Sequence, residues 1–100
     1  MSVTSERSED GKQLTIRVRE RFDFSAHQDF RSAYEDVPGD SRFVVDLQGA
    51  SYLDSSALGM LLLLRDHAGG ERADVQLINC SDAVRRILDI SNFSKLFVIG

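Results

Sequence analysis

The feature that most constrains the fold of this chain is the alternation of two hydrophobic periods along it. Leu14, Ile16 and Val18 alternate with polar residues, a period of two that is typical of a strand with one solvated face. Residues 26–37 instead place apolar side chains three and four positions apart, on one face of a helix. Segments of these two kinds follow one another along the chain, which predicts an α/β domain with helices packed on a sheet.

The order expected from these segments is β, β, α, β, α, β, α, β. Capping residues, glycines and Pro38 set the boundaries, and Ser25 with Gln28 three residues later has the spacing of a capping box. The expected elements after residue 18 are a helix from Ser25 to Val37, a buried strand 43–47, a helix from Ser55 or Ser56 to about Ala68, a strand 75–79, a helix capped by Ser81 and a strand 96–99.

Length and composition predict one domain over residues 1–100. The chain has 100 residues, 42% of them apolar and 28% charged, so it is too short for two ordinary domains and too apolar to be disordered. The first strand of the expected order is a short one before Gly11, and the polar residues 1–10 around it are expected to be loosely ordered. The lone Cys80 excludes an internal disulfide and favours a reducing compartment.

The same composition narrows location and partners. The apolar runs are far shorter than a membrane span, and the opening residues lack the parts of a signal peptide, so we expect a cytoplasmic protein with no membrane partner. A net charge of −4 has the wrong sign for gripping phosphate backbones, which disfavours nucleic acid as a partner.

The stretch 54–59 is the most informative for function. Asp54, Ser55 and Ser56 meet the start of the most hydrophobic helix, where four backbone N–H groups lack helical partners and attract anions. Helix capping alone is a sufficient explanation, with Gly59 as a close-packing position. The four leucines 61–64 cannot all face inward on a helix, so one of them is expected to contribute to an exposed partner patch.

The sequence FVVDL at 43–47, followed after six residues by DSSALG at 54–59, resembles the signature of the STAS domain of bacterial anti-sigma factor antagonists. The turn RFDF at 21–24 is similar to that family's turn, which places an aspartate at Asp23. Glu20 and Ala57 depart from this pattern, because the family usually has glycine at the first position and commonly at the second.

The resemblance implies a single STAS domain, a mixed sheet covered by helices. It also implies that Ser56 is phosphorylated by an anti-sigma factor with serine-kinase activity and reset by a serine phosphatase. The unphosphorylated form would bind that anti-sigma factor and free a sigma factor, and the phosphorylated form would release it. The residues expected to bind the partner or shape the site are Asp23, Asp54, Ser55, Ala57, Leu58 and Gly59.

Charge along the chain suggests how such a switch would act. Between Phe43 and Leu64 there is no Lys or Arg, and the only charges are Asp46 and Asp54. A phosphate on Ser56 would therefore add negative charge with no sequence-local cation, which predicts repulsion at an interface. Arg21 is a more distant basic residue that the fold could bring near.

Two other functional interpretations of the sequence remain open. In the first, the chain is a STAS-type ligand or scaffold module in which Ser56 is only a cap and the partner is not a sigma-factor system. In the second, Asp46 is the phosphoacceptor of a receiver domain, although the acidic pair and the lysine that a receiver needs are missing. Asp46 is more simply a carboxylate that orients a loop.

We expect no enzymatic activity, cofactor or metal. No acid, base and nucleophile can be assembled from the sequence, and no glycine-rich phosphate loop is present. His27 and His67 lack the spacing of metal ligands and are expected at the surface.

Overall fold

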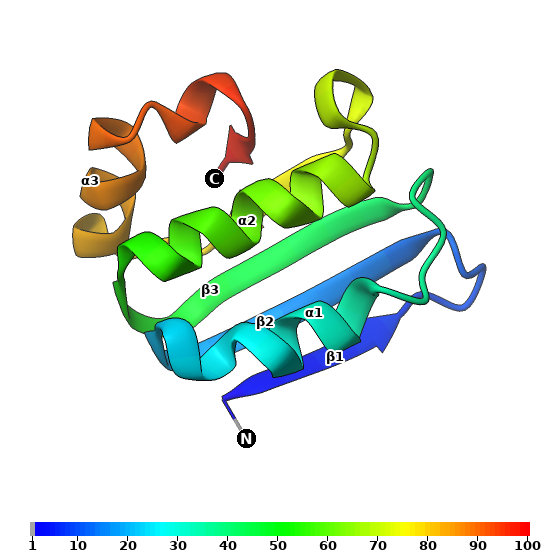
Figure 1. Ribbon diagram of the computed structural model, residues 1–100, viewed down its shortest axis with the longest axis horizontal. Helices are drawn as coiled ribbons and strands as arrows, with labels where there is room; N and C mark the ends of the chain where they lie inside the picture. The colour runs from blue at the N-terminus through cyan, green and yellow to red at the C-terminus, as the bar shows by residue number, and fades with distance from the viewer. Residues whose placement is uncertain (1) are drawn as a thin grey trace.

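The computed structural model describes residues 2–100, which form a five-stranded sheet with three helices (Figure 1). The strands are β1 (Val3–Arg7), β2 (Gln13–Phe22), β3 (Arg42–Leu53), β4 (Val75–Ile78) and β5 (Val98–Ile99). The helices are α1 (His27–Tyr34), α2 (Ser55–His67) and α3 (Asp82–Ile90), and short 3-10 turns are η1 (Phe24–Ala26), η2 (Gly70–Arg72) and η3 (Phe93–Lys95). The predicted α/β class and the predicted order of strands and α-helices are confirmed.

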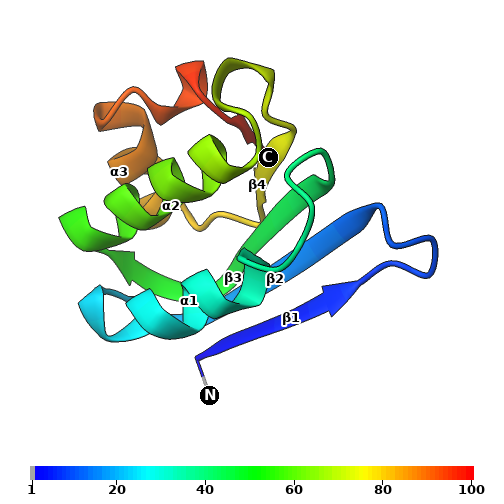
Figure 2. The ribbon, with the colours of Figure 1, turned by 45° about the vertical axis from the view of Figure 1, so that its right-hand side comes forward.

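The strands lie side by side in chain order, from β1 to β5. β1 is antiparallel to β2, and all later pairs are parallel. Crossovers between parallel strands are right-handed, so a sheet that always grows in one direction receives all its helices on one face. Figures 1 and 2 show this one-sided cover, with α1 and α2 lying along the same face of the sheet.

The core lies between this face and the helices. In β2, Leu14, Ile16 and Val18 are almost completely buried, as their period predicts. Phe43, Val45 and Leu47 of β3 and Leu61 and Leu64 of α2 are also fully buried. Within residues 2–100, no helix covers the opposite face of the sheet, which is more polar. Glu6, Arg17 and Asp46 form ion pairs there.

The third strand is longer than its apolar run. The sequence predicted a strand over 43–47 and then a six-residue loop, whereas β3 continues to Leu53. Its pairing with β2 shifts register between Arg17 and Arg19 and again between Glu20 and Arg21. These bulges break the period of two, and buried residues therefore recur at Leu47, Ala50 and Leu53, three apart.

The first helix also begins differently. Asp23, and not Ser25, is the capping residue, because its carboxylate accepts a hydrogen bond from the Ser25 amide at 3.0 Å. One turn of 3-10 helix follows, and α1 begins only at His27. The caps predicted for the other helices are confirmed, since Asp54 accepts from Ala57 N and Ser81 accepts from Val84 N.

The last strand is shorter than the predicted 96–99. Residues 93–95 form the turn η3, and β5 contains only Val98 and Ile99.

Candidate functional site

The turn that carries Ser56 lies where β3 passes into α2. This is the end of the sheet at which the parallel strands β2 and β4 also have their carboxyl ends. Asp54 has extended backbone and its Oδ1 accepts a hydrogen bond from Ala57 N at 2.9 Å, so the first turn of α2 is fixed. Ser55 and Ser56 are the first two helical residues. Ser55 is exposed and Ser56 is half-buried. The helix therefore presents one or two hydroxyls in a defined turn.

A second turn of similar build stands beside it. The amide of Asp54 donates to the carbonyl oxygen of Phe22 at 3.3 Å, so the turn after β3 is tied to the turn after β2. In that second turn Asp23 accepts hydrogen bonds from both the amide and the hydroxyl of Ser25. These bonds, more than the nearby Arg21, hold the pKa of Asp23 below its ordinary value. The structure thus brings together the two aspartates that the sequence singled out.

The ends of β2 and β3 are irregular just before these turns. Glu20 has a φ of 64°, in the left-handed region that favours glycine. The hydroxyl of Ser51 donates to the carbonyl oxygen of Glu20 at 3.2 Å, which joins the bulge of β3 to this residue. The preference for glycine that the family resemblance implied at this position thus has a backbone explanation.

Exposed apolar side chains are found close to the site. Phe24 follows Asp23 and is 72% exposed, and Tyr52 precedes Asp54 by two residues and is 42% exposed.

Of the leucine run, Leu61 and Leu64 are buried, whereas Leu62 and Leu63 are 38% and 50% exposed. The prediction that part of this run lies outside the core is confirmed.

The remaining helix residues divide between core and surface. Ala57 is completely buried, and Leu58 is partly buried against the core. Gly59 was expected to be a close-packing position, and this is wrong, because a Cβ built there would meet no atom within 4 Å. Gly59 instead marks an open position on the surface of α2.

Arg21, the basic residue outside 43–64 that the sequence suggested, lies beside the turn after β2. It pairs with Tyr52 in the sheet, and its guanidinium carbon lies 4.9 Å from the centre of the Tyr52 ring. Its Nε is 3.7 Å from Asp23 Oδ2. The only signal in the sequence was the position of Arg21 two residues before the predicted site residue Asp23.

Asp46 lies on the uncovered face of the sheet. Its Oδ1 accepts hydrogen bonds from Gln48 N at 3.0 Å and from Asn79 Nδ2 at 3.2 Å. The carboxylate therefore orients the bulged part of β3 and the residue after β4, in agreement with the loop-orienting role expected for it.

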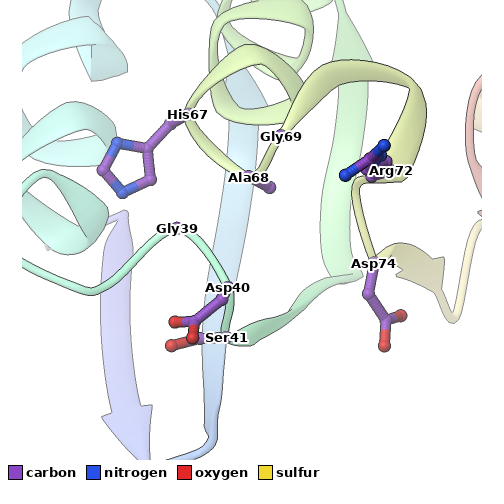
Figure 3. Close-up of a pocket in the computed structure, with 8 residues that line it drawn as sticks. All are labelled: Gly39, Asp40, Ser41, His67, Ala68, Gly69, Arg72 and Asp74. Atoms are coloured by element: carbon purple, nitrogen blue, oxygen red, sulfur yellow. The ribbon is translucent and has the colours of Figure 1, made fainter.

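His67 is not the surface residue that was expected. Its ring stands edge-on to Tyr34 and Phe43, at 5.1 and 5.9 Å between ring centres, and its Nε2 is 2.7 Å from the carbonyl oxygen of Val37. It joins the end of α2 to the loop before β3, beside a cavity of about 330 Å³ (Figure 3). This cavity lies at the opposite end of α2 from Ser56.

Within residues 2–100 no group of three His, Cys, Asp or Glu side chains is placed to hold a metal ion. Partial burial raises the pKa of the Cys80 thiol, which keeps it protonated near neutral pH.

Comparison with known proteins shows which family this chain resembles. A family model described as "Mlab, STAS domain" matches residues 5–99. The chain belongs to the STAS-domain family. A STAS-domain containing protein of Pseudomonas aeruginosa (strain UCBPP-PA14) is 64% identical to this STAS domain over 101 residues, covering 100% of both chains.

Solved structures share the fold. The anti-sigma factor antagonist SpoIIAA in its unphosphorylated form matches with a TM-score of 0.80 and 18% identity, over 98% of this STAS domain and 87% of SpoIIAA. An anti-sigma factor antagonist STAS domain from Rhodobacter sphaeroides matches with a TM-score of 0.59 and 27% identity, over 81% of this chain and 88% of that one. This STAS domain therefore has the SpoIIAA-like fold.

Proposed function

We propose that this STAS domain is an anti-sigma factor antagonist whose binding is controlled by phosphorylation of Ser56. The unmodified protein binds an anti-sigma factor with serine-kinase activity and so frees a sigma factor. Phosphorylation of Ser56 ends that binding, and a serine phosphatase restores it. The observation that carries the proposal is the Ser56 hydroxyl in the Asp54-capped first turn of α2, in a member of the STAS family.

The surroundings of Ser56 favour binding over catalysis. Phe24 and Tyr52 are exposed beside the site, and aromatic side chains of this kind are enriched in protein interfaces. Asp54 caps α2 through its Oδ1, which gives this carboxylate a structural role at the start of the helix. The chain then acts as a binding module and as a kinase substrate, without enzymatic activity or a cofactor of its own.

The modification changes charge more than shape. A phosphoserine carries about −1.5 to −2 charges at neutral pH, and here that charge would stand next to the Asp54 carboxylate. A partner surface that fits a neutral hydroxyl would have to desolvate this group, which costs several kcal/mol unless cations are supplied. SpoIIAA, which shares the fold, is known in both an unphosphorylated and a phosphorylated form.

The proposed setting is the cytoplasm, with proteins as partners and neither nucleic acid nor membrane. The overall charge of −4 supports the exclusion of nucleic acid. Among residues 2–100, no helix has the length and apolar character needed to cross a membrane.

Mapping of the modified residue tests the proposal. The protein is isolated from the cells it comes from, and its intact mass and fragment masses are compared for the parent, Ser56→Ala and Ser55→Ala. We expect one phosphate on Ser56 in the parent and in Ser55→Ala, and none in Ser56→Ala. A phosphate on Asp46 would instead support a receiver, and an unmodified Ser56 under all growth conditions would refute the switch.

A second candidate function is a STAS module that regulates a partner outside sigma-factor systems. One observation favours it: the matching family model carries the description "Mlab, STAS domain" and makes no reference to sigma factors. In that case Ser56 belongs only to the start of the helix, and Ser56→Ala would leave both transcription and the activity of the bound partner unchanged.

A further inference from the structure

Arg21 lies at the same end of the sheet as the Ser56 turn, although it belongs to a different strand. In the sheet register Phe22 pairs with Leu53, and the next amide, that of Asp54, donates to the Phe22 carbonyl oxygen. Arg21 therefore comes one residue before the point where the two chain segments meet, and Ser56 comes two residues after Asp54. Arg21 and Ser56 are thus within two residues of the same junction, on two different segments of the chain.

The guanidinium of Arg21 is held only weakly. Its Nε is 3.7 Å from Asp23 Oδ2, its carbon stands 4.9 Å from the Tyr52 ring centre, and the side chain is 68% exposed. Exposed ion pairs and exposed cation–π contacts contribute little to stability. Arg21 is therefore available to a stronger anion.

Asp23 does not need Arg21 to keep its place. The Asp23 carboxylate accepts two hydrogen bonds from Ser25, and these lower its pKa more than Arg21 does. The turn after β2 would keep its form if the guanidinium moved away.

We propose that Arg21 accepts the phosphate of Ser56: once Ser56 is phosphorylated, the guanidinium leaves Asp23 and Tyr52 and pairs with the phosphoryl oxygens. The inference rests on the proposed function, because it requires a phosphate at this serine. A phosphate offers more charge than a carboxylate and forms paired, charge-assisted hydrogen bonds with guanidinium. The move uncovers the Tyr52 ring, and a partner would still have to desolvate the exposed phosphate–guanidinium pair, so release on phosphorylation is retained.

The test uses the full chain with phosphoserine introduced at position 56 during translation, so no kinase is needed. The phosphate is titrated by ³¹P NMR in the parent, in Arg21→Gln and in Arg19→Gln. Arg19 is a matched control, because it is exposed on the same strand two residues earlier. We expect the second phosphate pKa, ordinarily about 6, to be about half a unit lower in the parent and in Arg19→Gln than in Arg21→Gln, as an exposed ion pair gives. Equal pKa values in the parent and Arg21→Gln would overturn the inference.

The NMR signals of the Tyr52 ring protons provide a second, independent measurement. Phosphorylation should shift the Tyr52 ring proton signals in the parent and in Arg19→Gln, and leave them almost unmoved in Arg21→Gln. Unmoved signals in the parent would also overturn the inference. The result is separate from the proposed function. If cells never phosphorylate Ser56, the proposed function fails and the NMR result on Arg21 still holds.

Discussion

Glu20 holds a backbone conformation that its side chain does not favour. With φ at 64°, a residue with a Cβ is strained, whereas glycine adopts this conformation freely. We expect Glu20→Gly to raise the free energy of unfolding by about 1 kcal/mol, measured by urea denaturation. Glu20→Ala keeps the Cβ and serves as the control, with no gain expected. Equal effects of the two substitutions would show that the left-handed backbone is not the cause.

Asp54 has two expected roles, and a second cap in the chain separates them. Asp54→Ala should lose about 1 kcal/mol of stability through the lost cap and also slow phosphorylation of Ser56, because a frayed turn presents the hydroxyl in many orientations. Ser81→Ala removes the cap of α3 and should cost a similar amount of stability. Its phosphorylation rate should stay normal. If both variants were phosphorylated at the parent rate, Asp54 would have only a structural role.

Residues whose role depends on one local rule were predictable, except at the first helix, where Asp23 and not Ser25 is the cap. Residues placed by tertiary contacts were not predictable. Asp54 and Ser81 follow from capping preference alone. His67 contacts Val37, Tyr34 and Phe43 from other elements, and nothing at its own position in the sequence indicates them. Arg21 came close to the site only through the pairing of β2 with β3.

At the scale of elements, a loop glycine and a helix glycine have opposite surroundings. A Cβ on Gly39 would lie 2.3 Å from the carbonyl oxygen of His67, whereas a Cβ on Gly59 would meet nothing within 4 Å. We expect Gly39→Ala to destabilise the fold by roughly 1–3 kcal/mol through overpacking. Gly59→Ala should stabilise α2 by up to about 1 kcal/mol through helix propensity. Thermal unfolding of the two variants checks both signs, and a loss of stability in Gly59→Ala would mean that α2 is packed there.

The regular parts of the elements could be predicted, and their irregular ends could not. The period of two in β2 and the caps of α2 and α3 located these elements within a few residues. The later half of β3 was missed because its bulges replace a period of two with buried residues three apart. That missed half leads directly into the Ser56 turn, so part of the candidate site lay where the sequence pattern is least informative.

At the scale of the whole molecule, the switch should act without refolding. Phosphorylation of Ser56 should weaken binding to the anti-sigma factor at least a hundredfold, which corresponds to roughly 2.8 kcal/mol. Backbone amide spectra of the two forms should differ only near the turns after β2 and β3. Calorimetry with unmodified and Ser56-phosphorylated protein measures the affinities. Equal affinities, or tighter binding by the phosphorylated form, would contradict the switch and favour the scaffold reading.

The position of the Ser56 turn at one end of α2 also determines where this molecule can be enlarged. α2 has 13 residues and is therefore about 20 Å long, and its far end leads into Gly69 and Gly70, where a Cβ on Gly70 would meet no atom within 4 Å. Surface loops of this kind accept extra chain at small cost in stability. A fluorescent tag or an additional domain could be inserted there and would stand a helix length away from the surface that the kinase has to reach.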